Sequence, residues 1–290
     1  MRRVHLPTLA MCLLPLLAWD AIPAGAQASP APLASVQLSY KFTPGQTLKY
    51  RIVQHVVGSR TMSGAKGSPS IDVELTSMIR MKCVQVLAGG IFEVSVDTES
   101  QSLKIAGKTV YGYAPSSESR SFQMTPSGKV TRTSPTSQSR TGFDFSSVES
   151  IIQMAIMPES PIVPGVTWSA ELPMPTDPTA SLKLAFTLQQ LRQTGGFAAA
   201  VIQEVLSTNP GTTGPASSER PTASQNGQMD LVFDATRGQL ASAKGTIRSH
   251  FATPVDVPAV PGASPGGKQL LTMDLNSSVT VEIQPETPLR

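Results

Sequence analysis

The chain has 290 residues, of which 40% are hydrophobic, 15% are charged and 5% are aromatic, with 25 Pro and 22 Gly. So little charge excludes a coiled coil and a disordered polyelectrolyte, and the glycines show no collagen period. The formal net charge of +3 comes without a dense Lys/Arg cluster, so we expect no nucleic-acid partner.

The first 28 residues have the pattern of a cleavable signal peptide. Arg2 and Arg3 precede a short apolar run over residues 6–19, and small residues then favour cleavage after Ala26 or Ala28. The run is shorter than the roughly 20 residues that a membrane-spanning helix needs, which disfavours the alternative of a retained anchor. The pattern predicts a periplasmic or secreted protein with no transmembrane segment after the signal is removed.

Apolar and polar residues alternate through most of the first half, which is typical of half-buried strands. Residues 36–42 and 48–56 alternate on either side of Pro44-Gly45, which predicts a hairpin. Residues 71–83 keep one apolar phase that flips at Val84, which predicts a bulge close to Cys83.

Two further turns follow, at Gly89-Gly90 and at residues 126–129, each with a returning strand. Cys83 is the single cysteine left after signal removal, so no internal disulfide can form. Its place in the apolar phase of a strand favours a buried apolar filler over an intermolecular link.

One segment breaks the β pattern and predicts a short helix over residues 146–157. Its apolar residues recur at helical spacing, Ser146 with Glu149 has the form of a capping box, and Pro158 ends the run. The candidate lining of an apolar ligand pocket comes from this helix and the strand that follows it: Ile151, Met154, Met157 and Trp168.

The second half returns to strands, interrupted by Pro/Gly/Ser-rich stretches over 208–227 and 253–267 that we expect to be surface loops. Pro164-Gly165 echoes Pro44-Gly45, and in both halves a hairpin at paired glycines and a shorter turn follow. The order is typical of two pseudo-repeats, at about 36–135 and 160–284, joined by the helix 146–157. Turn residues recur in any β protein, however, so chance explains the echo equally well.

Catalytic and metal-binding patterns are scarce, and the sequence predicts no enzyme, no metal site and no cofactor. His55 and His250 lie on polar strand faces with no carboxylate two residues away, which favours exposed surface histidines. Ser63 and Lys66 match the Ser-x-x-Lys of penicillin-recognising enzymes, but they lie in a Gly/Ser loop without the accompanying motifs. Of three function classes, a serine hydrolase therefore ranks third.

Several segments together resemble uncharacterised exported β-rich proteins of bacteria. The resemblance rests on residues 40–45 with Tyr50 and Arg51, on the Gly89-Gly90 hairpin, and on residues 124–130 and 164–168. It covers most of the mature chain through turn and strand signatures. It implies a signal peptide and a β-rich envelope protein, and it supplies no catalytic residues.

The sequence thus predicts a single all-β domain over residues 29–284, mainly antiparallel, of about ten to twelve strands with one short helix and a frayed tail at 285–290. The expected architecture is a curved half-barrel or sandwich. We expect a non-enzymatic binding protein of the bacterial cell envelope, which carries an apolar or lipid ligand in a curved sheet. The alternative is a structural module that binds an envelope protein through strand edges and Pro-rich loops.

Overall fold

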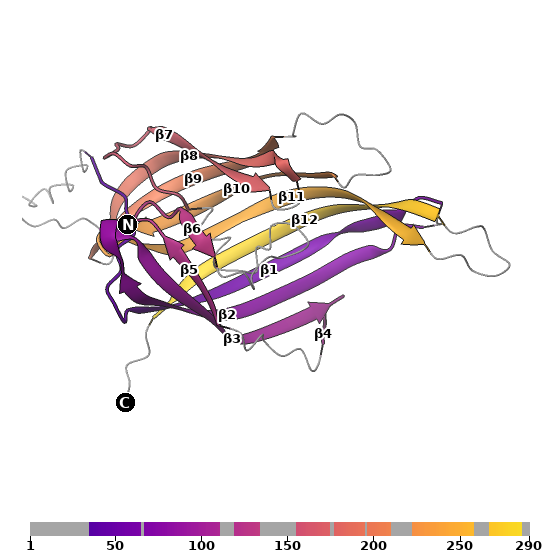
Figure 1. The fold of residues 1–290 in the computed structure, drawn as a ribbon, viewed down its shortest axis with the longest axis horizontal. Coiled ribbons are helices and arrows are strands. Elements are labelled where there is room, and N and C mark those ends of the chain that lie inside the picture. The colour runs from indigo at the N-terminus through magenta and orange to yellow at the C-terminus, as the bar shows by residue number, and fades with distance from the viewer. Residues whose placement is uncertain are drawn as a thin grey trace, which may run out of the picture. The chain divides into compact units, whose positions relative to one another are not determined.

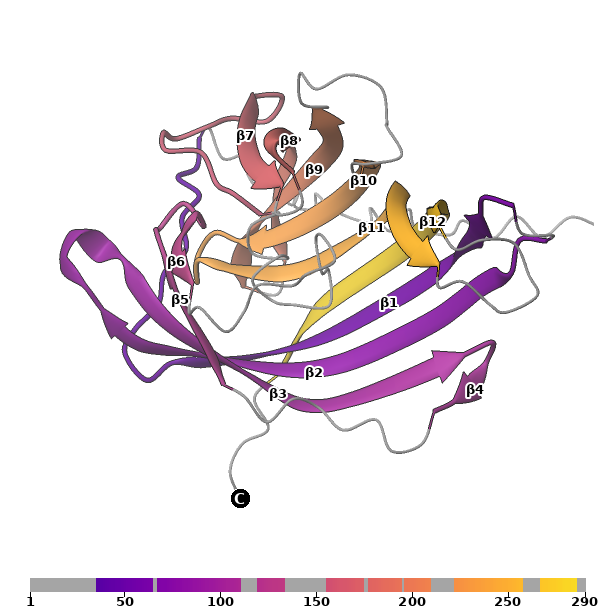
Figure 2. The same ribbon diagram turned by 45° about the vertical axis from the view of Figure 1, so that its right-hand side comes forward.

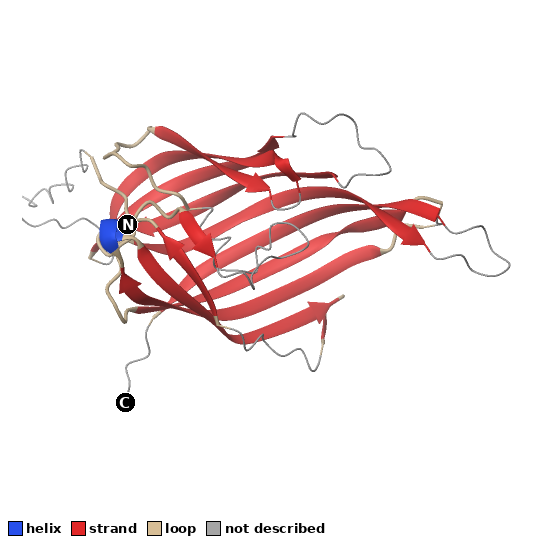
Figure 3. Cartoon of the chain, in the orientation of Figure 1, coloured by secondary structure: helices blue, strands red, loops and turns tan. Residues whose placement is uncertain are grey.

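The computed structural model describes residues 35–64, 67–110, 119–133, 155–174, 177–194, 196–209, 222–257 and 267–285. These residues form one antiparallel sheet of 12 strands that curves into an open trough (Figures 1 and 3). The predicted all-β fold with a curved half-barrel form is confirmed. The predicted signal peptide and the tail beyond residue 285 lie outside the described residues.

The strands follow one another with short turns at one end of the trough. Their bounds are β1 (Thr47–Met62), β2 (Ser70–Val86), β3 (Phe92–Ile105), β4 (Lys108–Thr109), β5 (Arg120–Met124), β6 (Val130–Thr133), β7 (Thr167–Met174), β8 (Asp177–Thr194), β9 (Phe197–Asn209), β10 (Thr222–Asp234), β11 (Gln239–Val257) and β12 (Gly267–Gln284). A 3-10 turn, η1 (Ala88–Gly90), lies between β2 and β3.

The last strand joins the two halves of the chain. The order across the sheet is β6-β5-β3-β2-β1-β12-β11-β10-β9-β8-β7, with β4 paired to the tip of β3. β12 pairs with β1 on one side and with β11 on the other, so the hydrogen-bonded ladder continues from the first half into the second.

The two faces of the sheet differ in chemistry. The concave face carries the core, for example Leu48, Tyr50 and Ile52 of β1, which are all buried. The convex face carries charged side chains in cross-strand pairs. These pairs are Lys49 with Glu99 (3.0 Å), Arg80 with Asp97 (3.0 Å) and Lys104 with Glu74 (2.7 Å).

Residues 36–46, here called the plug, differ from the prediction. The hairpin expected between residues 36–42 and 48–56 is wrong, because the plug stays out of the sheet and pairs only at an isolated bridge, Val36 with Ile162. The Tyr40 amide donates to the Pro126 carbonyl (2.7 Å) and the Lys41 amide to the Gly238 carbonyl (2.9 Å). The alternating pattern is real, but extended chain that packs across a trough shows the same period as a sheet strand.

The predicted helix 146–157 is not helical at the end that can be seen. Ala155 lies in a bend, Ile156 and Met157 have no regular secondary structure, and residues 146–154 lie outside the described residues. All three described residues are buried, and the Met157 amide donates to the Ser127 carbonyl (2.7 Å). Packing of these residues against the turn that contains Ser127 thus overrides the helical spacing.

The turns at Gly128 and Gly238 and the bulge beside Cys83 are confirmed, whereas the loops predicted over 208–227 and 253–267 are wrong in part, because residues 222–227 belong to β10 and residues 253–257 to β11. The register between β2 and β3 shifts between Cys83 and Gln85, and Cys83 is a buried free thiol. Gly128 and Gly238 adopt positive φ at the predicted turns. The Pro-Gly turns before β1 and β7 also make similar hydrogen bonds. The Gly45 amide donates to the Cys83 carbonyl, and the Gly165 amide donates to the Leu188 carbonyl. Whether the two halves are related repeats stays a prediction.

Candidate functional site: the concave face

The plug closes one end of the trough, here called the plugged end (Figure 2). Its inward side chains Leu38, Tyr40 and Phe42 are buried among strands from both halves. The Tyr40 ring meets Phe233 edge-on at 5.2 Å, and its hydroxyl donates to the Ala155 carbonyl (3.3 Å). Burial raises the pKa of the Tyr40 phenol. The plug and the strands around it thus form a packed core at this end.

Farther along the same strands, the concave face carries aliphatic side chains that are only partly covered. The register places them on the same face as the core residues. Those on β1, β2 and β12 are an even number of residues from a buried residue of the same strand, and those on β3 lie opposite inward residues of β2. We call this set the aliphatic wall. Its members are Val56, Ile71, Val73, Leu75, Leu103, Ile105, Leu271, Met273 and Leu275.

The wall spans β3, β2, β1 and β12, which are adjacent strands. Ile105 is 49% exposed, and the other members are half-buried. The convex face behind the wall is polar, with Asp72, Glu74, His55 and Asp274. A sheet that turns aliphatic groups to its hollow side and charges to its outer side has the form of an apolar binding surface.

Three inward glycines mark a sharp bend in the middle of the sheet. Gly58, Gly227 and Gly245 lie on β1, β10 and β11, in three successive rows of the register. A Cβ at any of them would come closer than 3.0 Å to a backbone carbonyl oxygen of the neighbouring strand. Glycine therefore lets the strands approach and coil at these points, which gives the trough its curvature.

Polar side chains cross the concave face between the wall and the buried side chains of β8 and β9. We call them the polar band: Glu204 (β9), Gln225 (β10), Ser249 (β11) and Ser277 (β12). All four are buried, and Glu204 is 0% exposed. Neither carboxyl oxygen of Glu204 has a hydrogen-bond partner, and the Gln225 Oε1 has none either among the described residues.

Burial also decides the charge of Glu204. Its cross-strand neighbours are Phe186 and Met229, both apolar and buried. Desolvation raises the pKa of the Glu204 carboxyl well above its ordinary value, which favours the neutral form of the group. A neutral carboxyl offers one hydrogen-bond donor and one acceptor.

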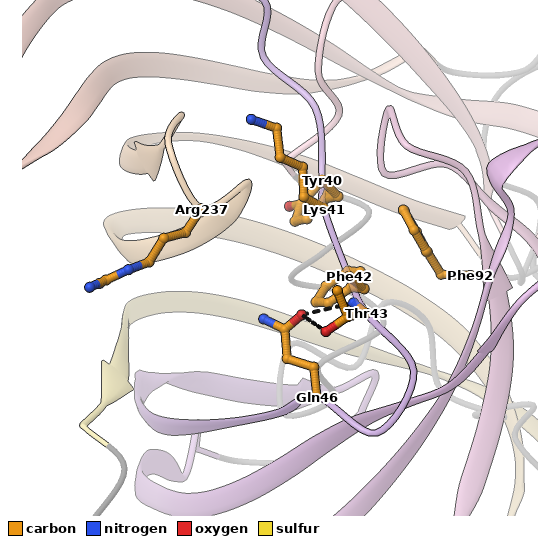
Figure 4. Close-up of a pocket in the computed structure, with 7 residues that line it drawn as sticks. All are labelled: Tyr40, Lys41, Phe42, Thr43, Gln46, Phe92 and Arg237. Carbon is orange, nitrogen blue, oxygen red and sulfur yellow. Dashed lines mark hydrogen bonds between the residues drawn. The ribbon is translucent and has the colours of Figure 1, made fainter.

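Two hollows lie at the rims of the plugged end. The first, of about 480 Å³, is open to solvent and lies between the plug, Phe92 and Arg237 (Figure 4). In it, Gln46 accepts hydrogen bonds from the amide (3.0 Å) and hydroxyl (3.5 Å) of Thr43. The second, of about 450 Å³, is lined by Lys129, Ile156 and residues 169–173. Neither contains a polar band residue, so the concave face remains the stronger candidate.

The candidate lining residues from the sequence divide into two groups. Met157 is buried, and Trp168 stacks on Phe186 at 5.3 Å while its Nε1 donates to the Ile156 carbonyl (2.8 Å). The structure thus places both in the packed core at the plugged end. Ile151 and Met154 lie outside the described residues. Their role in ligand binding stays a prediction.

The two histidines are exposed, as predicted, but each has an acidic partner. His55 Nε2 lies 2.8 Å from Asp72 Oδ1, and His250 Nδ1 lies 2.7 Å from Asp274 Oδ1. The search for carboxylates two residues away missed both, because the partners come from the neighbouring strand. The register rule that opposite and diagonal residues on paired strands meet could have found them once the pairing was known.

Ser63 takes a structural role at the far end of β1. Its hydroxyl accepts a hydrogen bond from the Leu270 amide (2.9 Å), and its own amide donates to the Leu270 carbonyl (3.0 Å). Lys66 lies outside the described residues. Across the residues that the structure describes, no three His, Cys, Asp or Glu side chains gather as metal ligands would, and no helix is long and apolar enough to cross a membrane.

Comparison with known proteins assigns no family. No family model and no curated protein matches the chain. A solved structure described by lipid-protein interactions in lipovitellin aligns with a TM-score of 0.45 and 9% identity, over 86% of this chain and 27% of that chain. A DUF1329 family protein from Desulfovibrio piger aligns with a TM-score of 0.15 and 9% identity, over 83% of this chain and 87% of that one.

The chain thus spans 27% of the length of the lipovitellin chain that it matches. Both TM-scores lie below 0.5, so neither structure assigns a function. The protein belongs to a class of architecture, an open, curved, antiparallel β-sheet with an apolar concave face.

Proposed function

We propose that this chain is a non-enzymatic binding protein that holds an apolar ligand, such as a lipid acyl chain, against the aliphatic wall. The observation that carries the proposal is the wall itself, in which nine aliphatic side chains from four adjacent strands line the concave face and stay partly exposed. Their transfer from water to an acyl chain is favourable by about 25 cal/mol per Å² of apolar surface buried.

The place of action belongs to the same proposal. The pattern of residues 1–28 supports export, and the low charge of the chain fits no nucleic-acid partner. We therefore propose that the ligand is carried in the bacterial cell envelope, in the periplasm or outside the cell.

A matched pair of variants on β12 tests the wall. Leu275 faces the hollow and Asn276, the next residue, faces outward. Leu275→Asp puts a charge against the acyl chain, while Asn276→Asp adds the same charge to the polar face. We expect Leu275→Asp to raise, at least about tenfold, the concentration of decanoate ester that displaces N-phenyl-1-naphthylamine. Asn276→Asp should leave that concentration within about twofold of the wild-type value.

Native mass spectrometry of protein purified from its own envelope gives the second readout. The wild type should retain a copurifying lipid mass that Leu275→Asp loses. Equal binding by both variants, with both still folded by circular dichroism, would refute a ligand site on the wall. A stable protein complex found by crosslinking in intact cells, without any lipid, would instead favour the alternative of a structural module.

A further inference from the structure

The polar band contains buried polar groups that have no hydrogen-bond partner among the described residues. Glu204 is fully buried with two unpartnered carboxyl oxygens, and Gln225, 2% exposed, has an unpartnered Oε1. Thr208 bonds the backbone of Gln225 through its hydroxyl (2.6 and 3.2 Å) and leaves the side-chain amide oxygen free. A buried polar group without a partner loses its hydrogen bonds to water and gains none in return, so such groups are rare in folded proteins.

The band lies where a ligand on the wall would end. Register places it on β9 to β12, and the wall begins on β12 and continues over β1, β2 and β3. Neighbouring strands are about 4.8 Å apart, so β9 lies roughly 14 Å from β12 across the hollow.

We propose that the polar band binds the head of the ligand whose chain lies on the aliphatic wall, and that this head is an uncharged group with both a hydrogen-bond donor and an acceptor, as in a primary amide. The inference rests on the proposed function and names its ligand class. The Glu204 carboxyl can donate to the carbonyl of such a head and accept from its N–H, and the Gln225 oxygen can accept from a second donor.

Other head groups fit the band less well. An ester has no donor, so it would leave the acceptors of Glu204 and Gln225 unsatisfied. An ammonium would require Glu204 to ionise among Phe186, Met229 and the Tyr40 ring, and the desolvation of two charges offsets their attraction. The protein has no buried cation beside Glu204 among the described residues.

Two ligands of equal chain length separate the contribution of the head group to binding affinity from that of the acyl chain. Decanamide carries donor and acceptor, whereas methyl decanoate carries acceptors only. Full-length mature wild type should bind decanamide about tenfold more tightly than methyl decanoate, measured by displacement of N-phenyl-1-naphthylamine. Glu204→Gln keeps a neutral donor and acceptor of the same shape, so it should retain that preference within about threefold.

Glu204→Met removes the hydrogen-bonding group that Glu204→Gln keeps. Met has similar length and no hydrogen-bonding head, so we expect decanamide to bind about tenfold more weakly and methyl decanoate to change less than twofold. Gln225→Met should reduce decanamide binding by a smaller factor, because Gln225 contributes only its Oε1 acceptor to the head, whereas Glu204 contributes a donor and an acceptor.

The outcomes separate this inference from the proposed function. If Glu204→Met folds and binds both ligands as the wild type does, the carboxyl takes no part in binding and the inference is wrong while the wall proposal stands. Stronger binding of decylammonium than of decanamide would also overturn it. If the wild type binds neither uncharged ligand, the proposed function itself fails.

Discussion

The plugged end and the aliphatic wall are built from the same strands and the same alternation, yet they differ in burial. On β1, Leu48, Tyr50 and Ile52 are buried at the plugged end, whereas Val56 farther along is only half-buried. On β12, Val281 is buried and Leu275 is not. The difference is what packs on the strands: the plug and residues 155–162 cover the first region. The alternation of apolar and polar residues determines which face of the sheet is apolar. Whether that face is buried depends on which segments pack against it.

The largest expected effect compares one leucine from each region. Leu38 of the plug is 0% exposed, and Leu275 of the wall is half-buried. Leu38→Ala should lower the free energy of unfolding by about 2–5 kcal/mol because it leaves a cavity in the core, whereas Leu275→Ala should cost less than about 1 kcal/mol. Denaturant unfolding measures both. Equal costs would mean that the two regions are equally packed.

A glycine pair tests whether the plug seats on the β10–β11 turn. Gly238 and Gly196 both have positive φ, but a Cβ at Gly238 would lie 2.6 Å from the Lys41 backbone nitrogen, whereas one at Gly196 would meet nothing within 4 Å. Both changes to Ala cost about 1–2 kcal/mol in backbone strain. We expect Gly238→Ala to cost at least about 1 kcal/mol more, since the plug must move. Thermal melts that shift equally would show that this contact does not form.

Glu204 should be a source of instability in the ligand-free protein. Replacing its unpartnered carboxyl with the apolar side chain of Glu204→Met removes a buried polar group, so the free energy of unfolding should rise by about 1–3 kcal/mol. Denaturant unfolding of ligand-free protein measures the change. A loss of stability would contradict the unpartnered state of this carboxyl.

The raised pKa of Glu204 should also make the stability of the protein depend on pH. The pKa of Glu204 is raised in the folded protein, so the cost of burying this carboxyl is smallest below the unfolded pKa of about 4.3 and grows as pH rises toward the folded value. Stability should therefore fall with pH above about 5, by at most about 1.4 kcal/mol per pH unit from this group. In Glu204→Gln this slope should vanish.

Two carboxylates on the convex face have lowered pKa values, but they do not mask the fall in stability above about pH 5 that we expect from Glu204. The Lys104 hydrogen bond lowers the pKa of Glu74, and hydrogen bonds from Ser119 and Arg80 lower that of Asp97. The stability from these carboxylates is present above their unfolded pKa values and is lost as pH falls, so it varies in the acid range alone.

The smallest effects should come from the exposed histidine pairs. His55 and His250 are 45% and 48% exposed, and water screens their interactions with Asp72 and Asp274. His55→Ala and His250→Ala should each change the free energy of unfolding by less than about 0.5 kcal/mol and leave ligand displacement unchanged. A larger change in binding would move the candidate site to the convex face.

Sequence patterns predicted the local features of the fold well. The two-residue period found the strands, and the phase change at Val84 found the bulge beside Cys83. Prediction went wrong where two structures share one period or where packing overrides spacing. Val36–Phe42 alternates as a strand does but forms the plug, and Ala155–Met157 belongs to a helical pattern but packs as irregular chain.

The candidate site could not be read from sequence for a related reason. Glu204 and Gln225 look like ordinary polar residues in strands, and the aliphatic wall looks like more core. What makes them a site is the pairing of β9 with β10 and of β12 with β1, which brings residues from distant parts of the chain onto one concave face. Long-range register depends on the whole sheet, so no local window contains it.

The sequence by itself determined an all-β chain, its turns at glycines in positive φ and the polar or apolar character of each strand face, because these follow from local backbone sterics and a period of two. Tertiary structure alone decided which apolar residues the plug buries, which remain on the wall, and that Glu204 faces the hollow without a partner. The physical reason is that burial and hydrogen bonding depend on neighbours in space, which the order of residues along one strand does not specify.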